Sequence, residues 1–144
     1  MILIDGPVDK IALPALKNIY EPGTIIYLGG PMTSKSMATM DFRAAVQANA
    51  YAYLMKAGFN VFAPLLPHDI TKKYGLAFEY ERYAVIDETF IDRVAQVVAF
   101  LCMPGWRESK GVSRELAAAA NSETPYHFIE FDSNSTLWAE SDGE

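Results

Sequence analysis

Apolar side chains follow two alternating periods along this chain. Four short stretches rich in apolar and β-branched residues are typical of strands, at residues 24–28, 60–66, 96–103 and 126–131. Three stretches between them carry apolar residues at helical spacing, at 40–57, 79–95 and 111–121. Strands that alternate with helices predict a single α/β domain whose parallel sheet carries helices on both faces.

The helical stretches indicate which of their faces are buried. The first places six side chains on one stripe: Phe42, Val46, Ala50, Tyr53, Leu54 and Ala57. Gly58 then supplies the residue that commonly ends a helix. The second stretch places five side chains on its stripe: Tyr83, Ile86, Phe90, Ile91 and Val94. The run from Gln96 to Met103 is apolar after its first residue, which predicts a central strand buried on both faces.

Residues 1–23 differ in character from the rest of the chain. They contain Pro7, Pro14 and Pro22, and we assign them to an N-terminal extension that precedes a domain over residues 24–144. The apolar residues Ile2, Leu3 and Ile4 predict an additional edge strand.

Composition and charge exclude several classes of protein. The formal net charge is −6 and the twelve basic residues are scattered, so polymeric nucleic acid is not an expected partner. No apolar stretch approaches the roughly 20 residues that cross a bilayer, and the first residues lack a signal-peptide pattern. We therefore expect a cytoplasmic protein without a membrane partner. The single cysteine, Cys102, lies in an apolar run, which excludes an internal disulfide and indicates a buried thiol.

The sequence predicts neither a metal site nor a cofactor. His68 and His127 stand apart, without the spacing of metal ligands. The loop after the first core strand has neither the Walker pattern nor the Gly-x-Gly-x-x-Gly fingerprint of dinucleotide-binding proteins.

Ligands of parallel α/β sheets bind beyond the carboxyl ends of the strands, which directs attention to three loops, at 29–36, 64–69 and 104–115. The first begins with Gly29, Gly30 and Pro31 and continues with hydroxyl residues and one lysine, a composition suited to a phosphate or a sugar. The polar residues 67–78, which include His68, Lys72 and Lys73, predict a loop able to cover such a site.

Asp87 falls within the apolar stripe of its predicted helix, whereas Glu88 and Asp92 point elsewhere. A carboxylate on an apolar face must be paired, hydrogen-bonded or raised in pKa, and a raised pKa suits a proton donor near neutral pH. A salt bridge to Arg82 or Arg93 is the structural alternative.

Residues 104–115 form a turn that leads into a helix whose first amides can hold an anion, a task for which Ser109 and Gly111 are suited. Glu115 is expected within about the first turn, where the helix dipole would keep it ionised and competent as a nucleophile. The alternative for Glu115 is simple charge compensation at a helix N-terminus.

Three motifs together resemble the nucleoside 2-deoxyribosyltransferase superfamily: Ile26-Tyr27-Leu28-Gly29-Gly30-Pro31-Met32-Thr33, Asp87-x-x-Phe90-Ile91, and Pro104-Gly105-Trp106-x-x-Ser109-x-Gly111-x-x-x-Glu115. The order and spacing of the motifs carry this resemblance, which spans about residues 24 to 131. The motifs are most similar to a compact bacterial and phage branch that looks like the 2′-deoxynucleoside 5′-monophosphate N-glycosidases.

The resemblance implies a flavodoxin-like fold, a homodimer or larger assembly, and a nucleophilic glutamate that corresponds to Glu115. It implies that Asp87 assists departure of the base, although counting back from the following strand would select Glu88. Ser109 stands where relatives that act on 5′-monophosphates bind the phosphate, and Tyr27 matches a tyrosine near the site, although it would equally suit a core strand.

The function expected from these observations is hydrolysis of the base–sugar bond of a small nucleotide through a glycosyl-glutamate intermediate. Gly29, Gly30, Pro31, Ser109 and Gly111 are the expected substrate and phosphate ligands. A deoxyribosyltransferase that exchanges bases, a noncatalytic nucleotide sensor and an enzyme acting on a nicotinamide nucleotide are the alternatives.

Overall fold

The computed structural model describes residues 4–64, 73–75, 80–132 and 138. The elements with defined bounds are β1 (Lys10–Ile11), η1 (Leu13–Ala15), α1 (Leu16–Ile19), β2 (Ile25–Gly29), α2 (Met37–Lys56), β3 (Asn60–Phe62), α4 (Tyr80–Arg93), β4 (Val97–Leu101), α5 (Lys110–Asn121) and β5 (Tyr126–Ile129).

Five strands form one parallel sheet in the order β1-β5-β4-β2-β3. The order β3-β2-β4-β5 is the flavodoxin-like arrangement, in which the second strand of the unit lies outside the first. All five residues of β4 are buried, because helices cover both faces of the sheet. The predicted single-domain flavodoxin-like α/β fold and its central buried strand are confirmed.

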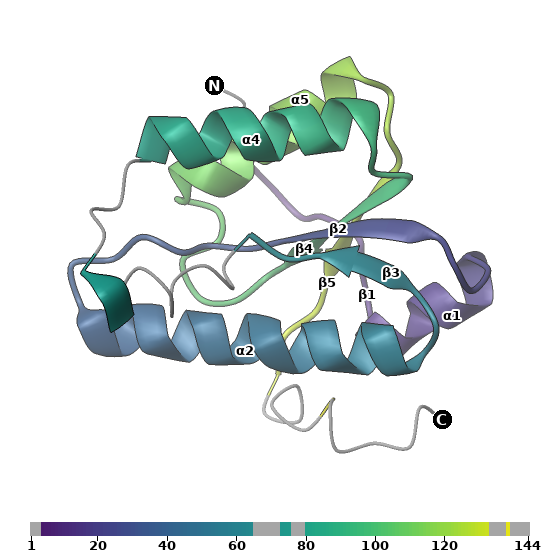
Figure 1. Cartoon of the computed structure of the whole chain (residues 1–144), viewed down its shortest axis with the longest axis horizontal. Coiled ribbons are helices and arrows are strands. Elements are labelled where there is room, and N and C mark those ends of the chain that lie inside the picture. Colours follow the sequence, from purple (N-terminus) through teal and green to yellow (C-terminus); the bar gives the residue numbers. More distant parts are fainter. Residues whose placement is uncertain (1–3, 65–72, 76–79, 133–137, 139–144) are drawn as a thin grey trace.

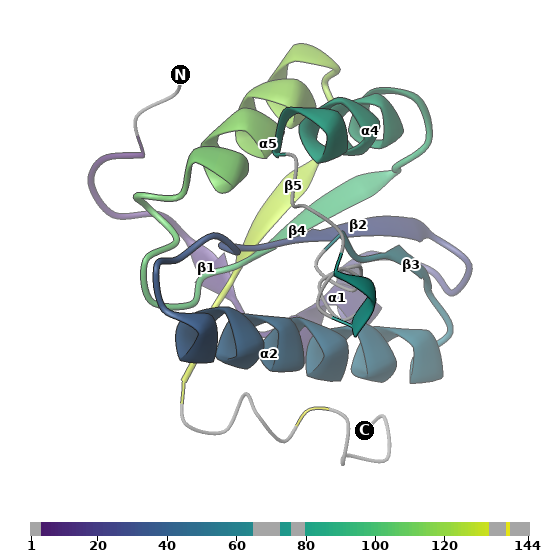
Figure 2. The ribbon, with the colours of Figure 1, turned by 60° about the vertical axis from the view of Figure 1, so that its left-hand side comes forward.

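The helices form a layer on each side of the sheet. Figure 1 shows α2 below the sheet and α4 with α5 above it, and the turned view in Figure 2 preserves this arrangement. Successive residues of β2 point to opposite faces of the sheet. Ile26 and Leu28 lie in the core between the sheet and α2, whereas Tyr27 lies in the core between the sheet and the helices α4 and α5. Tyr27 therefore faces the two helices that carry Asp87 and Glu115.

The end of α2 agrees with the sequence, whereas its exposed start does not. Gly58 follows the helix with a φ of +97°, a conformation that favours glycine, as expected for a helix stop. Phe42, predicted on the buried stripe, is 42% exposed. The strand predicted over residues 60–66 ends at Phe62, shortly before Pro64, which has no N–H for a ladder.

The buried face of α4 is rotated relative to the prediction. Ile86 is 54% exposed and Val94 is 45% exposed, so neither belongs to the buried stripe. The inward positions are Ala84 and Ile91, with Asp87 and Glu88 half-buried between them. An apolar pattern misses this face because two of its positions carry carboxylates.

A strand from the N-terminal segment completes the sheet, but it is formed by later residues than predicted. The edge strand is Lys10–Ile11, which pairs in parallel with β5. Ile4 lies outside any strand, and Ile2 and Leu3 lie outside the described residues. Leu13 and Leu16 follow the strand and are fully buried under the α2 face. We infer that the burial of these two leucines determines which residues form the edge strand, because it holds Lys10 and Ile11 against β5.

The predicted covering loop falls mostly outside the described residues, as do His68 and Lys72. Lys73 and Tyr74 are described and are helical, which corrects the loop prediction at these two positions. His127 lies on β5, where its Nε2 is 2.6 Å from the hydroxyl of Tyr20. Within the part of the chain that the structure describes, no helix is both long and apolar enough to span a membrane.

Candidate functional site

Glu115 lies on the inner face of α5, with 8% of its surface exposed. The helix begins at Lys110 and is capped by Ser109, whose hydroxyl accepts a hydrogen bond from the N–H of Val112 at 3.2 Å. Glu115 is thus in the second turn, beyond the free N–H groups of the helix end. The prediction of a first-turn glutamate kept ionised by the helix dipole is wrong, because the side chain lies deeper in the fold.

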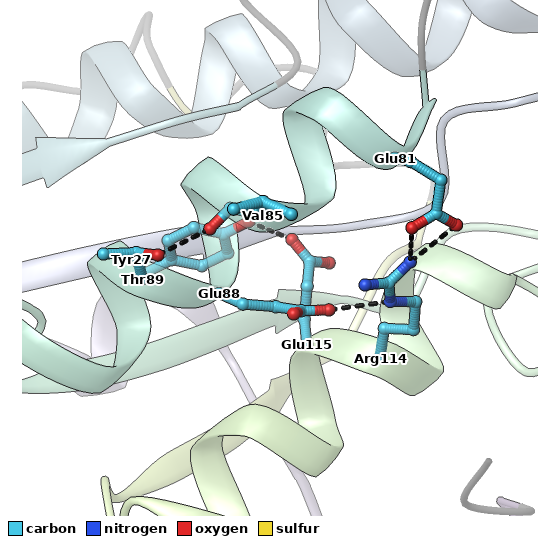
Figure 3. A network of polar contacts seen from close by, with 7 residues as sticks. All are labelled: Tyr27, Glu81, Val85, Glu88, Thr89, Arg114 and Glu115. Atoms are coloured by element: carbon cyan, nitrogen blue, oxygen red, sulfur yellow. Dashed lines mark hydrogen bonds and ion pairs between the residues drawn. The ribbon is translucent and has the colours of Figure 1, made fainter.

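Tyr27 and Glu115 are joined by a buried hydrogen bond. The Tyr27 hydroxyl donates to Oε2 of Glu115, and Figure 3 shows the two side chains meeting between the strand and α5. Tyr27 is fully buried, and the loss of water and the neighbouring carboxylates raise its pKa well above the ordinary value. The phenol therefore stays protonated and remains a hydrogen-bond donor.

The second oxygen of Glu115 lies beside a residue without a side chain. A Cβ on Gly29 would stand 3.3 Å from Oε1 of Glu115 and 3.2 Å from the Phe100 ring. Glycine at this position therefore leaves room next to the oxygen that Tyr27 does not bind. Gly30 faces the opposite layer, where a Cβ would stand 3.1 Å from Cε of Met103, and Pro31 is buried.

Asp87 approaches the same tyrosine from α4. Its carboxylate lies close enough to the Tyr27 hydroxyl to interact with it, and this contact opposes the effect of burial on the Asp87 pKa. Arg93, one of the partners considered for Asp87, lies 3.9 Å from Asp92 on the outer side of the helix. The fold therefore brings Tyr27, Gly29, Asp87 and Glu115 together from three elements.

The two carboxyl groups hold their protons more strongly than free carboxylic acids do. Burial raises the pKa of Glu115 to about 8, and Asp87 and Glu88 add to this rise. Burial also raises the pKa of Asp87 to about 6, with a further contribution from Glu88. Near neutral pH the pair therefore shares about one proton, with the two acids titrating as a coupled unit.

Glu88 is not part of that shared hydrogen-bond centre but lies next to it. It was expected to point away from the buried stripe, yet it turns toward α5, where Nε of Arg114 donates to it at 2.7 Å. Arg114 also binds both carboxylate oxygens of Glu81, at 2.9 and 3.0 Å, as Figure 3 shows. Arg114 thus clamps two acidic side chains of α4 beside Glu115.

Ser109 and Gly111 lie at the N-terminus of α5, as predicted. The Ser109 hydroxyl is engaged as the helix cap, and the nearest atom to a Cβ on Gly111 would be that same hydroxyl, at 3.7 Å. Backbone N–H groups in the first turn of a helix suit an anion. The arrangement separates this anion-binding end from Glu115, which lies six residues beyond Ser109 on the same helix.

Arg43 ties two of the predicted site loops together and was missed by the sequence analysis. Its Nη1 donates to the carbonyls of Met32 and Thr33 at 3.3 and 3.0 Å, and its Nη2 donates to that of Pro104 at 3.1 Å. Arg43 precedes the buried Gln47 by four residues on α2. Asp87 was singled out because it is a charged residue on an apolar helix face. The same criterion, applied to the buried face of α2, would have identified Arg43.

Aromatic rings also pack beside Tyr27. The Phe62 and Phe90 rings stack with centroids 4.4 Å apart, and the Phe62 ring lies 5.7 Å from that of Tyr27. Both phenylalanines are half-buried, so this apolar wall continues from the core to the surface. In the described ranges, no group of three or more His, Cys, Asp or Glu side chains is arranged to hold a metal ion.

Most of this domain matches one known protein family. Residues 24–130 match the family described as Domain of unknown function (DUF1937). The chain belongs to the DUF1937 family. The match begins just before β2 and ends just after β5, so Tyr27, Asp87 and Glu115 all lie within the DUF1937 region, whereas β1, η1 and α1 precede it. No curated protein matches the chain.

Proposed function

We propose that this DUF1937 protein hydrolyses the N-glycosidic bond of a nucleoside or deoxynucleoside 5′-monophosphate, with Glu115 as nucleophile and Asp87 as proton donor. One observation carries the proposal: the buried carboxyl of Glu115 and the half-buried carboxyl of Asp87, from different helices, face a single tyrosine hydroxyl. A pair of carboxyl groups, one ionised and one protonated, is the arrangement that acid-assisted glycoside cleavage through a covalent intermediate uses.

In the first step, Oε1 of Glu115 attacks C1′ of the sugar from the space beside Gly29. The new C1′–O bond forms as the C1′–N bond breaks, through a transition state with oxocarbenium character. Asp87 gives its proton to the departing base, so the base leaves neutral and Asp87 becomes ionised. Tyr27 keeps its proton and holds Oε2 of Glu115, which orients the attacking oxygen.

In the second step, water attacks C1′ of the glycosyl ester. Asp87 takes a proton from that water, the bond to Glu115 breaks, and the products are the free sugar phosphate and the original pair of acids. Asp87 thus acts first as an acid and then as a base.

The shared proton must move for this cycle to begin. In the free protein burial raises the pKa of both Glu115 and Asp87, so the pair holds a proton that the mechanism needs on Asp87. A bound base that accepts a hydrogen bond from Asp87 favours the proton on Asp87, and the developing positive charge at C1′ favours ionised Glu115. Substrate binding therefore produces the reactive distribution.

The 5′-phosphate has a suitable place at the start of α5. Ser109 and the first-turn amides of the helix offer hydrogen bonds to an anion, and no acidic side chain stands at position 109 to repel it. Ser109 precedes Glu115 by six residues, so the proposed phosphate end and the proposed nucleophile belong to the same helix.

The direct test is base release from a panel of ribo- and deoxyribonucleoside 5′-monophosphates, followed by chromatography. Wild type should release one or more bases, whereas Glu115→Gln should lose at least about 10³-fold and Asp87→Asn about 10²-fold or more, typical losses for a nucleophile and an acid. Asp92→Asn, on the same helix but exposed, is the matched control and should keep full activity. Mass spectrometry of acid-quenched wild type should find the sugar phosphate on the peptide that contains Glu115.

Other outcomes would redirect the assignment. Base exchange with an added second base but no hydrolysis would make the protein a deoxyribosyltransferase. Tight binding of a nucleotide without release or exchange would leave a nucleotide-binding protein. Equal activity of wild type and Glu115→Gln would overturn the proposed nucleophile.

A further inference from the structure

We propose that Arg114 is a positioning residue that, by holding Glu88 in an ion pair beside the Tyr27–Glu115–Asp87 cluster, limits the negative charge acting on the two reacting carboxyls. The inference rests on the proposed function, which supplies the roles of Glu115 and Asp87. It concerns a side chain that touches neither substrate nor reacting atoms.

The geometry places Arg114 between the surface and the reacting pair. Its side chain is 28% exposed, against 73% for Glu81 and 32% for Glu88, so the Glu88 contact is the inner one. Glu81 binds the guanidinium through both carboxylate oxygens and fixes its orientation from the outer side. Arg114 is therefore held from two turns of α4 while projecting from α5, as Figure 3 shows.

The charged groups around Glu115 account for the effect. From β2 the Tyr27 hydroxyl faces it, from α4 Asp87 and Glu88 face it, and Arg114 adjoins it on α5. Glu88 raises the pKa of both Glu115 and Asp87. An anion paired with a guanidinium at 2.7 Å exerts a smaller field on its neighbours than an unpaired anion does.

Two single substitutions should move the titration in opposite directions. Arg114→Met keeps the aliphatic stem and leaves Glu88 as an unpaired anion, so ionisation of Glu115 should shift to higher pH, by about one pH unit. Glu88→Gln removes that anion, so ionisation of Glu115 should shift to lower pH, by about half a unit or more. A purely structural role would alter stability in both variants without this opposition of sign.

The measurement is the carboxyl ¹³C NMR titration of Glu115 in glutamate-labelled full-length protein, assigned by its absence in Glu115→Gln. The alkaline limb of the pH profile for base release should move with it. Arg93→Met, an exposed arginine of α4, is the matched control and should leave the titration unchanged. In the Glu88→Gln background, Arg114→Met should add less than half of its shift in wild type.

The outcomes separate this inference from the proposed function. Opposite shifts in the two single variants, with the effect of Arg114→Met reduced to less than half in the Glu88→Gln background, support the inference, even if no nucleotide is hydrolysed and the proposed function fails. Shifts of the same sign, no shift in Arg114→Met, or an equal effect of Arg114→Met with and without Glu88 would overturn it, even if wild type releases base.

Discussion

Glu115 has little water around it, and this property dominates its chemistry at the scale of one residue. Its carboxyl is buried on α5, receives a hydrogen bond from Tyr27, and has neighbouring acids on α4. Loss of hydration and like charges outweigh the hydrogen bond, because the net effect is a raised pKa. The proton is thus held where the proposed mechanism must release it, which makes substrate binding part of the activation.

The raised pKa of Glu115 predicts a pH-dependent cost to folding. Its value of about 8 lies above the ordinary 4.5, so the folded state favours the protonated acid. The associated stability is full below about pH 4.5 and is lost as the pH rises through 8, by an upper limit of roughly 3–5 kcal/mol. Glu115→Gln, which cannot ionise, should therefore be more stable than wild type at pH 9.

Urea denaturation of both proteins at pH 5 and pH 9 measures this effect. The stability difference between Glu115→Gln and wild type should favour the variant by a few kcal/mol more at pH 9 than at pH 5. A difference independent of pH would show that Glu115 titrates normally in the folded protein.

At the scale of elements, the loop after β2 and the loop after β4 are held together by Arg43 from α2. Gly105 allows this contact, because a Cβ there would stand 2.6 Å from Nη2 of Arg43. Its φ of +90° is a second reason for glycine. The loop that carries Met32 and Thr33 and the loop that carries Pro104 are therefore positioned relative to each other by one guanidinium.

Gly105→Ala should destabilise the protein more than Gly23→Ala, a control substitution that introduces similar backbone strain but no steric clash. Gly23 has a φ of +91° with nothing within 4 Å of its Cβ position, so Gly23→Ala isolates the backbone cost of about 1 kcal/mol or more. Gly105→Ala should cost roughly 1–2 kcal/mol beyond that, because the Arg43 contacts are lost. Urea denaturation measures both.

The Arg43→Met background provides the control for that comparison. The excess cost of Gly105→Ala should shrink there, since the guanidinium that clashes with the new methyl is gone. An excess of the same size in both backgrounds would place the cost elsewhere than at Arg43.

At the scale of the whole molecule, the fold extends beyond the DUF1937 region. The matched residues 24–130 contain four strands, and the fifth strand, β1, comes from the preceding segment. Leu13 and Leu16 of that segment pack into the core under α2. The homodimer and the cytoplasmic location expected from the sequence stay predictions.

The N-terminal segment should accordingly contribute to global stability. Leu16→Ala removes a fully buried side chain and should lower the free energy of unfolding by about 2–5 kcal/mol. Ile19→Ala, in the same helix but 50% exposed, is the control and should cost about 1 kcal/mol or less. Equal and small effects would mean that the segment docks without supporting the core.

The order of the elements, the parallel sheet and the buried central strand could be predicted from sequence, because strand and helix periods are properties of a single element. The sequence also selected Tyr27, Asp87 and Glu115 as candidates. It misplaced the edge strand, the buried face of α4 and the turn that carries Glu115.

The partners of these groups depend on the tertiary structure, and so does the raised pKa of Glu115. Tyr27, Asp87 and Glu115 come from three elements, and their meeting follows from the β3-β2-β4-β5 order and from the packing of α4 beside α5. The contacts of Arg43 and Arg114 likewise join segments distant in the chain. Desolvation and charge depend on what other elements place around a side chain. The apolar stripe around Asp87 indicated its raised pKa, whereas nothing within its own helix indicated that of Glu115.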